Sequence, residues 1–179
     1  MSLQEEKTCT VSYIESLPEG KRAELIDGVV YDMGAPAEDH QIISGEIFTD
    51  INLYIRQHQG KCKVFAAPYA VYLDQDDLTY VEPDITVVCD DSRRDKKGCH
   101  GAPDWILEIV SPSTRARDYF IKLFKYRSAG VREYWIVDPD KRKVRTYDLV
   151  NDDTADYGFD EFVPAMIFPG FSLRIGDYI

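Results

Sequence analysis

The sequence predicts an α/β fold in which a mixed central β-sheet is flanked by helices. Two segments, 38–59 and 113–129, carry apolar residues at helical spacing. The other regular segments are short, rich in β-branched and aromatic residues, and separated by proline, glycine and acidic turns. In the middle of the chain the order is strand, strand, strand, helix, strand, which is compatible with a mixed sheet that contains one crossover.

The first elements are predicted from cap and turn residues. Thr10 can cap a short helix that ends at the following LPEG sequence. The segment 23–33 is expected to form two extended pieces joined at Asp27-Gly28, a dipeptide favoured in tight hairpin turns. The first long helix comes next, and Gly60 is a natural stop signal at its end.

Strands and one further helix are expected in the remainder. The expected strands are 63–68, 70–74, 84–89, 104–110, 133–138 and 144–150, followed by a weaker terminal hairpin. Ser113 or Thr114 can cap the second helix, and Gly130 marks its end. The expected apolar stripe of this helix consists of Tyr119, Phe120, Leu123, Phe124 and Tyr126.

Length and composition indicate an ordinary globular chain. Its 179 residues are 44% hydrophobic and 30% charged, and we expect one domain at 10–179 after a flexible segment at 1–9. No apolar run approaches the roughly 20 residues that span a bilayer, and the N-terminus lacks the features of a signal peptide. We therefore expect a cytoplasmic protein without a membrane partner. The four cysteines form no CxxC pair, so reduced thiols are the favoured interpretation.

The formal net charge is −11, from 32 acidic and 21 Lys and Arg residues. This is the wrong sign for a protein that holds nucleic acid through a broad basic surface, although it does not exclude nucleic acid. Acidic clusters at 74–77 and 151–161 are expected to be solvated loops. Basic residues gather at 93–97 and 115–118, where they could offset the repulsion locally.

Two carboxylates stand at unusual places in apolar strands. Glu108 lies within the apolar run 105–110, and Asp84 opens a second strand directly after Pro83. An ionised acid in such a run needs hydrogen bonds, a cation or a metal ion. Two acids from two strands can bind a hard divalent cation. The simpler alternatives are that Asp84 caps a turn and that Glu108 pairs with a core arginine or points outward from an edge strand.

Lys122 is the third candidate, on the helix that follows Glu108. A lysine near a metal site can orient the attacking water and stabilise developing charge. Asp118, however, lies four residues before Lys122, which is also the spacing of an ordinary salt bridge on a helix. The spacing does not distinguish between these two roles.

Several sequence segments together resemble the Uma2 family, a branch of the PD-(D/E)XK nuclease-like superfamily that includes restriction endonucleases. The resemblance extends from about residue 10 to the C-terminus, and it rests on ELIDGVV, HQIISGEI, EPDITVV, APDWILEIVSPSTRARD and KLFKYRSAGVREYWIVDP. It implies a restriction-endonuclease-like core with a mixed central sheet. It also implies that acids on adjacent strands hold Mg²⁺, with Mn²⁺ as an alternative ion.

The resemblance assigns roles to individual residues. The two acids of the core pair correspond to Asp84 and Glu108. The superfamily's usual lysine would stand two residues after the second acid, where this chain has Val110. The matching lysine on the following helix is Lys122, which implies that the lysine has migrated in this branch.

Other matched positions are assigned less specifically. Glu24 corresponds to a metal-linked acid and His40 to a polar residue facing the site, so both join the candidate catalytic residues. Alternatively, Glu24 is a surface acid and His40 has no chemical task. Asp118 is expected to support the helix, and Tyr126 and Tyr134 are expected to line the core or the site.

The leading hypothesis is an Mg²⁺-dependent endonuclease that hydrolyses phosphodiester bonds in DNA. In it Asp84, Glu108 and Glu24 hold the metal and Lys122 positions the attacking water. One rival is an inert binding or assembly module with a nuclease fold, and another is a metal-dependent hydrolase of a small phosphorylated substrate. A homodimer or higher homo-oligomer is expected, since cutting both strands of a duplex is easiest with two sites and closed two-fold symmetry is the commonest assembly.

Overall fold

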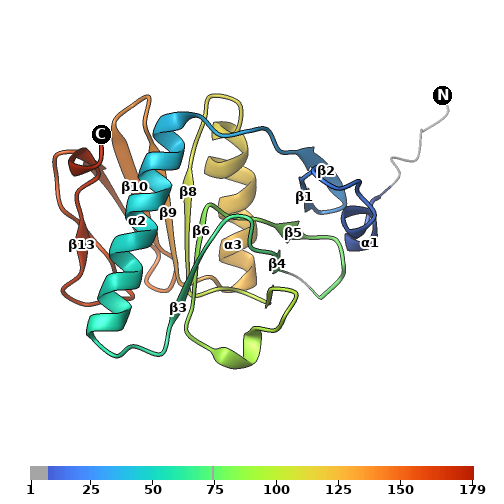
Figure 1. Ribbon diagram of the computed structural model, residues 1–179, viewed down its shortest axis with the longest axis horizontal. Coiled ribbons are helices and arrows are strands. Elements are labelled where there is room, and N and C mark those ends of the chain that lie inside the picture. The colour runs from blue at the N-terminus through green and yellow to red at the C-terminus, as the bar shows by residue number, and fades with distance from the viewer. Residues whose placement is uncertain (1–7, 74) are drawn as a thin grey trace.

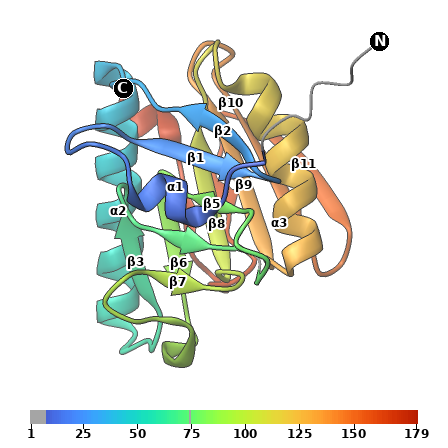
Figure 2. The same ribbon diagram turned by 90° about the vertical axis from the view of Figure 1, so that its right-hand side faces the viewer.

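A six-stranded mixed sheet forms the centre of the computed structural model, which describes residues 8–73 and 75–179. Helix α2 (Glu38–Gln57) covers one face, and helix α3 (Leu123–Ala129) covers the other (Figures 1 and 2). The strands are, in spatial order, β11 (Asp153–Gly158), β10 (Lys143–Asp148), β9 (Glu133–Asp138), β8 (Trp105–Ile109), β6 (Ile85–Val88) and β3 (Lys63–Ala66). Strands β8 and β9 pair in parallel, through a crossover that contains α3, and the other neighbours pair antiparallel. The predicted fold class is confirmed.

A second, smaller sheet contains the N-terminal hairpin. Its order is β2 (Val29–Asp32), β1 (Ala23–Ile26), β5 (Tyr80–Val81), β4 (Val71–Tyr72) and β7 (Cys99–His100), and helix α1 (Val11–Glu15) lies beside it. The turn predicted between β1 and β2 is present. Asp27 and Gly28 have φ angles of 51° and 77°, the left-handed conformations that a two-residue hairpin of this type needs. Strands β5 and β7 were not predicted, because a strand of two residues is too short to show an alternation of apolar and polar side chains.

Helix α2 packs on the large sheet through a row of isoleucines. Ile43, Ile47, Ile51 and Ile55 recur every fourth residue, are at most 5% exposed, and pack in one cluster with the tryptophans of β8 and β9. The helix ends two residues earlier than expected. Gln59 (φ 51°), rather than Gly60, takes the left-handed conformation, and the Gly60 N–H donates to the carbonyl of Ile55.

Strand β8 sends alternate side chains to the two faces of the sheet. Trp105, Leu107 and Ile109 belong to the core beneath α2, whereas Ile106 packs in the core beneath α3. Glu108 has the same parity as Ile106, so its side chain points toward α3. The alternation therefore places the carboxylate between the sheet and the second helix.

The predicted second helix is present but is oriented differently from the expectation. It begins with a π-helical segment, η2 (Arg117–Lys122), continues as α3, and ends at Gly130 (φ 95°) as predicted. Of the expected stripe, Tyr126 is fully buried, but Phe120 and Phe124 are 74% and 67% exposed. Asp118 and Lys122 are buried in their place. The expected apolar face was therefore wrong at these two phenylalanines, because the face turned to the sheet carries the charged groups of the site described below.

Two further expectations need correction. The acidic segment 151–161 is not wholly a loop, because β11 occupies its centre and pairs along its whole length with β10. An ion pair between Arg145 and Asp156, directly opposite each other, makes an acidic sequence compatible with this edge strand. The other cluster behaves as expected at residues 75–77, which form an exposed turn, while residue 74 lies outside the described residues.

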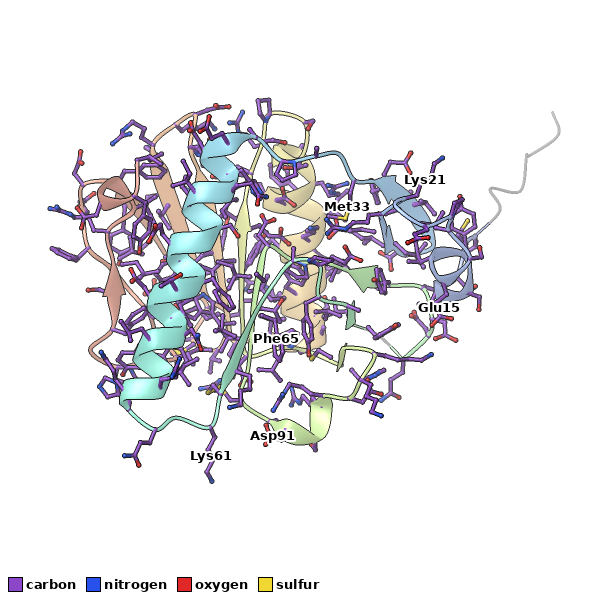
Figure 3. The ribbon with its side chains drawn as sticks, in the orientation of Figure 1. Glu15, Lys21, Met33, Lys61, Phe65 and Asp91 are labelled. Carbon is purple, nitrogen blue, oxygen red and sulfur yellow. A yellow bond between two sulfur atoms is a disulfide. The ribbon has the colours of Figure 1, made fainter. Side chains whose placement is uncertain are left out.

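The cysteines were also misjudged in part. Cys62 and Cys89 form a disulfide, whereas Cys9 and Cys99 remain thiols. Both disulfide partners lie one residue beyond a paired position of β3 and β6. Cys62 directly follows Lys61, which is labelled at the lower edge of Figure 3. Strand pairing over 27 residues of sequence brings them together, and no local cysteine motif could have indicated it.

Two further predictions concern the N-terminal segment and the C-terminal hairpin. Residues 1–7 of the predicted flexible segment lie outside the described residues, and the backbone N–H of Cys9 donates to the carbonyl of Gly28. The predicted terminal hairpin is present as β12 (Val163–Pro164) and β13 (Ser172–Leu173). Within the described ranges, every helix is too short or too polar to cross a bilayer.

Candidate active site

Lys122 lies at the centre of a buried cluster of charges. Its ammonium nitrogen donates to Oε1 of Glu24 and to Oε1 of Glu108, with both distances 2.8 Å. The lysine and glutamate side chains are at most 6% exposed. Strand β1, strand β8 and segment η2 each contribute one of these residues, so the cluster joins parts of the chain that are up to 98 residues apart.

Neighbouring groups hold both glutamates in place. The Tyr126 hydroxyl donates to Oε1 of Glu108 at 2.8 Å, and the Glu82 backbone N–H donates to Oε1 of Glu24 at 3.2 Å. Arg117 lies 3.7 Å from Oε2 of Glu24, and its guanidinium stands over the ring of Tyr31. Of these groups the sequence predicted only Tyr126 near the site. The contacts made by the Glu82 backbone and by Arg117 were not predicted.

The same helical face supplies three of the buried polar groups. Asp118, Lys122 and Tyr126 are four residues apart and all point toward the sheet, and Oδ1 of Asp118 lies 3.5 Å from the Lys122 ammonium. The Tyr134 hydroxyl of β9 donates to the Asp118 carbonyl within the π-helical segment. Departures from α-helical geometry of this kind occur frequently at functional sites.

Asp84 and His40 form the outer part of the site. The pairing of Ile85 with Leu107 places Asp84 directly opposite Glu108 on the neighbouring strand. Oδ2 of Asp84 accepts the Ile109 backbone N–H at 2.7 Å and lies 3.1 Å from Nε2 of His40, in the first turn of α2. These two side chains are 15% and 19% exposed, so they lie closer to solvent than Lys122.

Burial and charge shift the proton affinities in the cluster. Desolvation raises the pKa of Glu108 well above its usual range, even though Lys122 opposes the shift. Desolvation also raises the pKa of Asp118. Burial alone would lower the pKa of Lys122, but Glu108, Glu24 and Asp118 together raise it well above the ordinary value. Lys122 is therefore an ammonium at neutral pH and acts as a hydrogen-bond donor rather than as a base.

The donor set fits a divalent cation in chemistry and charge. Oε2 of Glu24 and Oδ1 of Asp118 are buried without a hydrogen-bond partner among the described residues. Carboxylate oxygens are the ligands that Mg²⁺ prefers. With all four carboxyl groups deprotonated, as metal binding requires, Glu24, Asp84, Glu108 and Asp118 together with the cations Lys122 and Arg117 carry a formal charge of −2 when His40 is neutral. Within residues 8–73 and 75–179, however, no three His, Cys, Asp or Glu side chains are already arranged around a metal position.

The pairing of His40 with Asp84 predicts a pH-dependent contribution to stability. Burial lowers the pKa of His40, but the hydrogen bond and charge of Asp84 outweigh it, so the pKa is raised above 6.5. The stabilisation that protonated His40 gives to the folded state is therefore complete below pH 6.5 and is lost as the pH rises through the raised pKa of His40. We expect His40→Gln to remove this part of the pH dependence, about 1 kcal/mol in the free energy of unfolding. Denaturant unfolding at a series of pH values measures it, and His58→Gln, at the exposed end of α2, is the control.

If the His40→Gln and His58→Gln proteins lose stability in parallel with wild type above pH 6.5, the interaction with Asp84 does not hold a proton on His40. In that case His40 would still form its hydrogen bond with Asp84, but as a neutral imidazole.

The structure therefore brings the sequence candidates together. Lys122 contacts Glu24 and Glu108 directly, and Asp84 with His40 adjoins them across the strand pair. Val110, where the superfamily's lysine was expected, is 3% exposed and packs in the apolar core beneath α3. The ammonium group near Glu108 comes from the helix.

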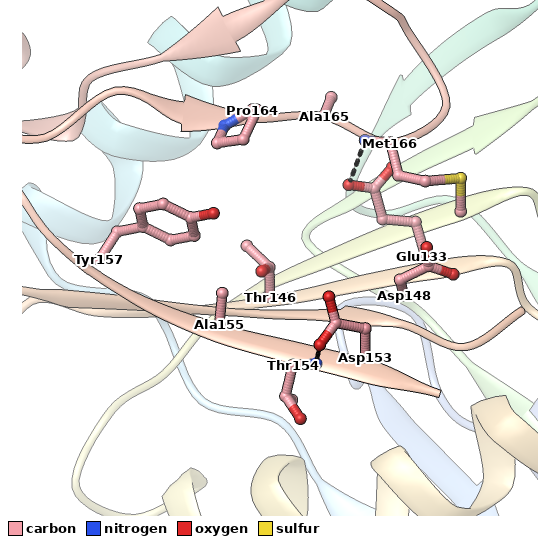
Figure 4. A pocket seen from close by; sticks show the side chains of 10 residues that line it. All are labelled: Glu133, Thr146, Asp148, Asp153, Thr154, Ala155, Tyr157, Pro164, Ala165 and Met166. Atoms are coloured by element: carbon pink, nitrogen blue, oxygen red, sulfur yellow. Dashed lines mark hydrogen bonds between the residues drawn. The ribbon is translucent and has the colours of Figure 1, made fainter. Parts of the chain in front are cut away.

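A separate pocket of about 180 Å³ lies elsewhere, between β9, β10, β11 and the segment around β12. Figure 4 shows Glu133, Asp148, Asp153 and Met166 among its lining residues. Glu133 is saturated by three N–H donors, from Trp135, Met166 and Ile167. These hydrogen bonds explain why Glu133 is buried. Glu133 lies apart from the Lys122 cluster.

Known proteins resemble this chain over most of its length. It is 26% identical over 134 residues to the uncharacterized protein slr1290 of Synechocystis sp. (strain ATCC 27184 / PCC 6803 / Kazusa), a match that covers 74% of this chain and 68% of the relative. A crystal structure described as "a putative nuclease belonging to DUF820", from Anabaena variabilis ATCC 29413, superposes with a TM-score of 0.77 at 26% identity. That match covers 94% of this chain and 96% of the other. The model of the Uma2 family, described as "Putative restriction endonuclease", matches residues 11–176, which include all five candidate residues, and this chain belongs to the Uma2 family.

Proposed function

We propose that this protein is an Mg²⁺-dependent nuclease that hydrolyses phosphodiester bonds in DNA. The observation that carries the proposal is the position of the Lys122 ammonium, 2.8 Å from two buried carboxylates on different strands. Asp84, opposite Glu108, adds a third carboxylate. Membership of the Uma2 family and the fold shared with a nuclease-described structure support the same chemistry.

In this proposal Asp84, Glu108 and Glu24 hold the metal ion. Bound there, Mg²⁺ or Mn²⁺ supplies a water of lowered pKa and neutralises charge on the scissile phosphate. Lys122, in place of the lysine absent at Val110, donates hydrogen bonds that orient the attacking water. Its raised pKa supports this role, since the side chain keeps its positive charge through the reaction.

The surrounding groups orient these residues. The Ile109 N–H holds one oxygen of Asp84, and the Tyr126 hydroxyl holds one oxygen of Glu108. Nε2 of His40 donates to the carboxylate of Asp84 and so limits the rotation of that carboxylate. These contacts reduce the reorganisation that substrate binding would require.

We also propose that residues 10–179 act as one domain and that two or more copies assemble. Cutting both strands of a duplex is easiest with two sites, and closed two-fold symmetry is the commonest assembly. Light scattering of the purified protein measures the mass in solution, and a monomer at working concentration would contradict the assembly without affecting the chemistry.

Metal binding and cleavage test the proposed function together. Calorimetric titration with Mg²⁺ and Mn²⁺ should detect binding to wild type, and plasmid DNA should be cleaved only with the metal. Asp84→Ala and Glu108→Ala should abolish cleavage while the protein remains folded by circular dichroism. Asp153→Ala, which removes an exposed acid outside the cluster, is the control.

Other outcomes identify the competing functions. Absence of metal binding by a folded wild type would indicate an inert module with a nuclease fold. Turnover of small phosphodiesters without cleavage of plasmid or single-stranded DNA would indicate a hydrolase of small phosphorylated substrates, which a net charge of −11 tolerates more easily.

A further inference from the structure

A hollow of about 430 Å³ lies on the outer side of η2, away from the buried acids. Its lining combines two aromatic rings, Tyr119 and Phe120, with three cations, Arg115, Lys141 and Arg145. Its volume is within the range of sites that hold a small organic ligand or one nucleotide. The combination is unusual on a chain with a net charge of −11.

The hollow and the acid cluster lie at the same edge of the large sheet. Pro112 follows the end of β8, and Lys141 follows the end of β9, which runs parallel to β8. Asp84 opens β6, which is antiparallel to β8, so it lies at this edge as well. In Figure 1 the connection after β8 and the turn between β9 and β10 both lie at the upper edge, near the start of α2. A polymer crossing this edge could contact both places.

Phe120 offers a flat apolar surface to solvent. It is 74% exposed, although it follows the buried Asp118 by only two residues. Aromatic rings exposed beside cations are the usual platform for unpaired bases, because every base has a face that can stack. A paired base inside a duplex presents no such face, so exposed rings of this kind favour single-stranded over duplex nucleic acid.

The cations are held at the rim by carboxylates. Arg115 donates through Nε and Nη2 to Asp138 and Asp140, and Arg145 donates in the same way to Asp156. The Lys141 side chain is 57% exposed, with its ammonium 3.9 Å from Oδ2 of Asp138 and 5.9 Å from the centre of the Tyr119 ring. These positions suit one or two phosphates, fewer than the roughly 6–10 phosphate contacts of typical duplex-binding proteins.

We propose that this hollow binds an unpaired nucleotide of a single-stranded nucleic acid, with the base stacked on Phe120 and the neighbouring phosphate at Lys141 and Arg115. The proposal rests on the proposed nuclease function and adds to it a site for an unpaired strand, which a duplex supplies only where its two strands separate. Stacking supplies affinity that does not depend on net charge, which reconciles an acidic chain with a polyanionic substrate.

Fluorescence anisotropy in EDTA tests the binding without cleavage. Wild type should bind a fluorescein-labelled oligothymidylate more tightly than a blunt duplex of equal length. Phe120→Ala should weaken single-strand binding roughly 5- to 150-fold, and Phe120→Tyr should restore most of it. Phe124→Ala is the matched control, because Phe124 is 67% exposed in the same helical segment but does not line the hollow. Lys141→Ala should lower the slope of log affinity against log salt by about 0.7.

Three outcomes would overturn the proposal. Equal weakening by Phe120→Ala and Phe124→Ala would make the loss non-specific, and duplex binding as tight as single-strand binding would remove the selectivity. A fall in molecular mass on Phe120→Ala, with unchanged oligonucleotide affinity, would show that a second copy of the chain covers the hollow. Mg²⁺-dependent plasmid cleavage is measured separately on wild type, and its presence alongside any of these outcomes would leave the nuclease function intact, so the two proposals can fail separately.

Discussion

Lys122→Met is expected to abolish metal-dependent cleavage and to lower the free energy of unfolding by about 3–5 kcal/mol. The substitution keeps most of the side-chain volume but removes the ammonium that donates to Glu24 and Glu108. Glu108 is then left buried without a cation, and Glu24 keeps only the more distant Arg117 at 3.7 Å. The loss of one partner from a buried ion pair costs more than the pair contributes. Chemical denaturation in EDTA measures the stability, and plasmid cleavage measures the activity.

The same substitution should strengthen metal binding. Without the ammonium, the formal charge of the cluster falls to −3 when its carboxylates are ionised and His40 is neutral, and each glutamate loses the bond that its Oε1 accepts from Lys122. Mn²⁺ should therefore raise the melting temperature of the Lys122→Met protein by more than it raises that of wild type. Lys143→Met, at an exposed position of β10, is the control for loss of one positive charge.

A protein that loses activity, keeps its stability and binds Mn²⁺ no more tightly would contradict this interpretation. In that case Lys122 would contribute to the reaction without balancing the buried carboxylates. A protein that loses stability but still cleaves DNA at the wild-type rate would place Lys122 in the structure alone.

The central strands and the turns were predictable because their signals are local. The Asp27-Gly28 turn, the isoleucine row of α2 and the apolar run around Glu108 each specify a conformation within a few residues. The chain order then placed the crossover helix between β8 and β9, so Lys122 was expected near Glu108 before any contact was visible.

The parts that were missed depend on partners far away in the sequence. Phe120 and Phe124 look like core residues at helical spacing, yet the buried face carries Asp118 and Lys122. Glu24 and Glu108 supply the opposite charges to Lys122, and Lys122 in turn lies 3.5 Å from Asp118. No hydrophobic pattern encodes that preference. The acidic strand β11 and the Cys62–Cys89 disulfide were missed for the same reason, because each depends on the register of a neighbouring strand.

Arg117 was unassigned because its role depends on two neighbours outside its own segment. The sequence shows it only within the basic run 115–118, which also contains an acid. In the structure its guanidinium lies between Glu24 and the ring of Tyr31, both on the N-terminal hairpin. Only the docking of that hairpin against η2 distinguishes Arg117 from a solvated arginine.

Glu133→Ala is expected to lower the free energy of unfolding by about 3–5 kcal/mol without touching the Lys122 cluster. Glu133 is 2% exposed, and its two oxygens accept N–H groups from Trp135, Met166 and Ile167 at 2.7–2.9 Å. Alanine leaves these three donors without an acceptor, and each buried unsatisfied donor costs about 1–3 kcal/mol. The carboxylate also ties the segment between β12 and β13 to β9, so hydrogen exchange at Met166 and Ile167 should accelerate.

Two comparisons separate the hydrogen bonds from the charge of Glu133. Glu133→Gln keeps one acceptor oxygen but turns an NH₂ group toward an N–H donor, so its stability should lie between those of Glu133→Ala and wild type. Asp153→Ala, in the same pocket but exposed, should change stability by less than about 0.5 kcal/mol. If Glu133→Ala is as stable as Asp153→Ala, the terminal hairpin is held by its apolar contacts, above all Phe168 and Leu173, and the carboxylate is dispensable.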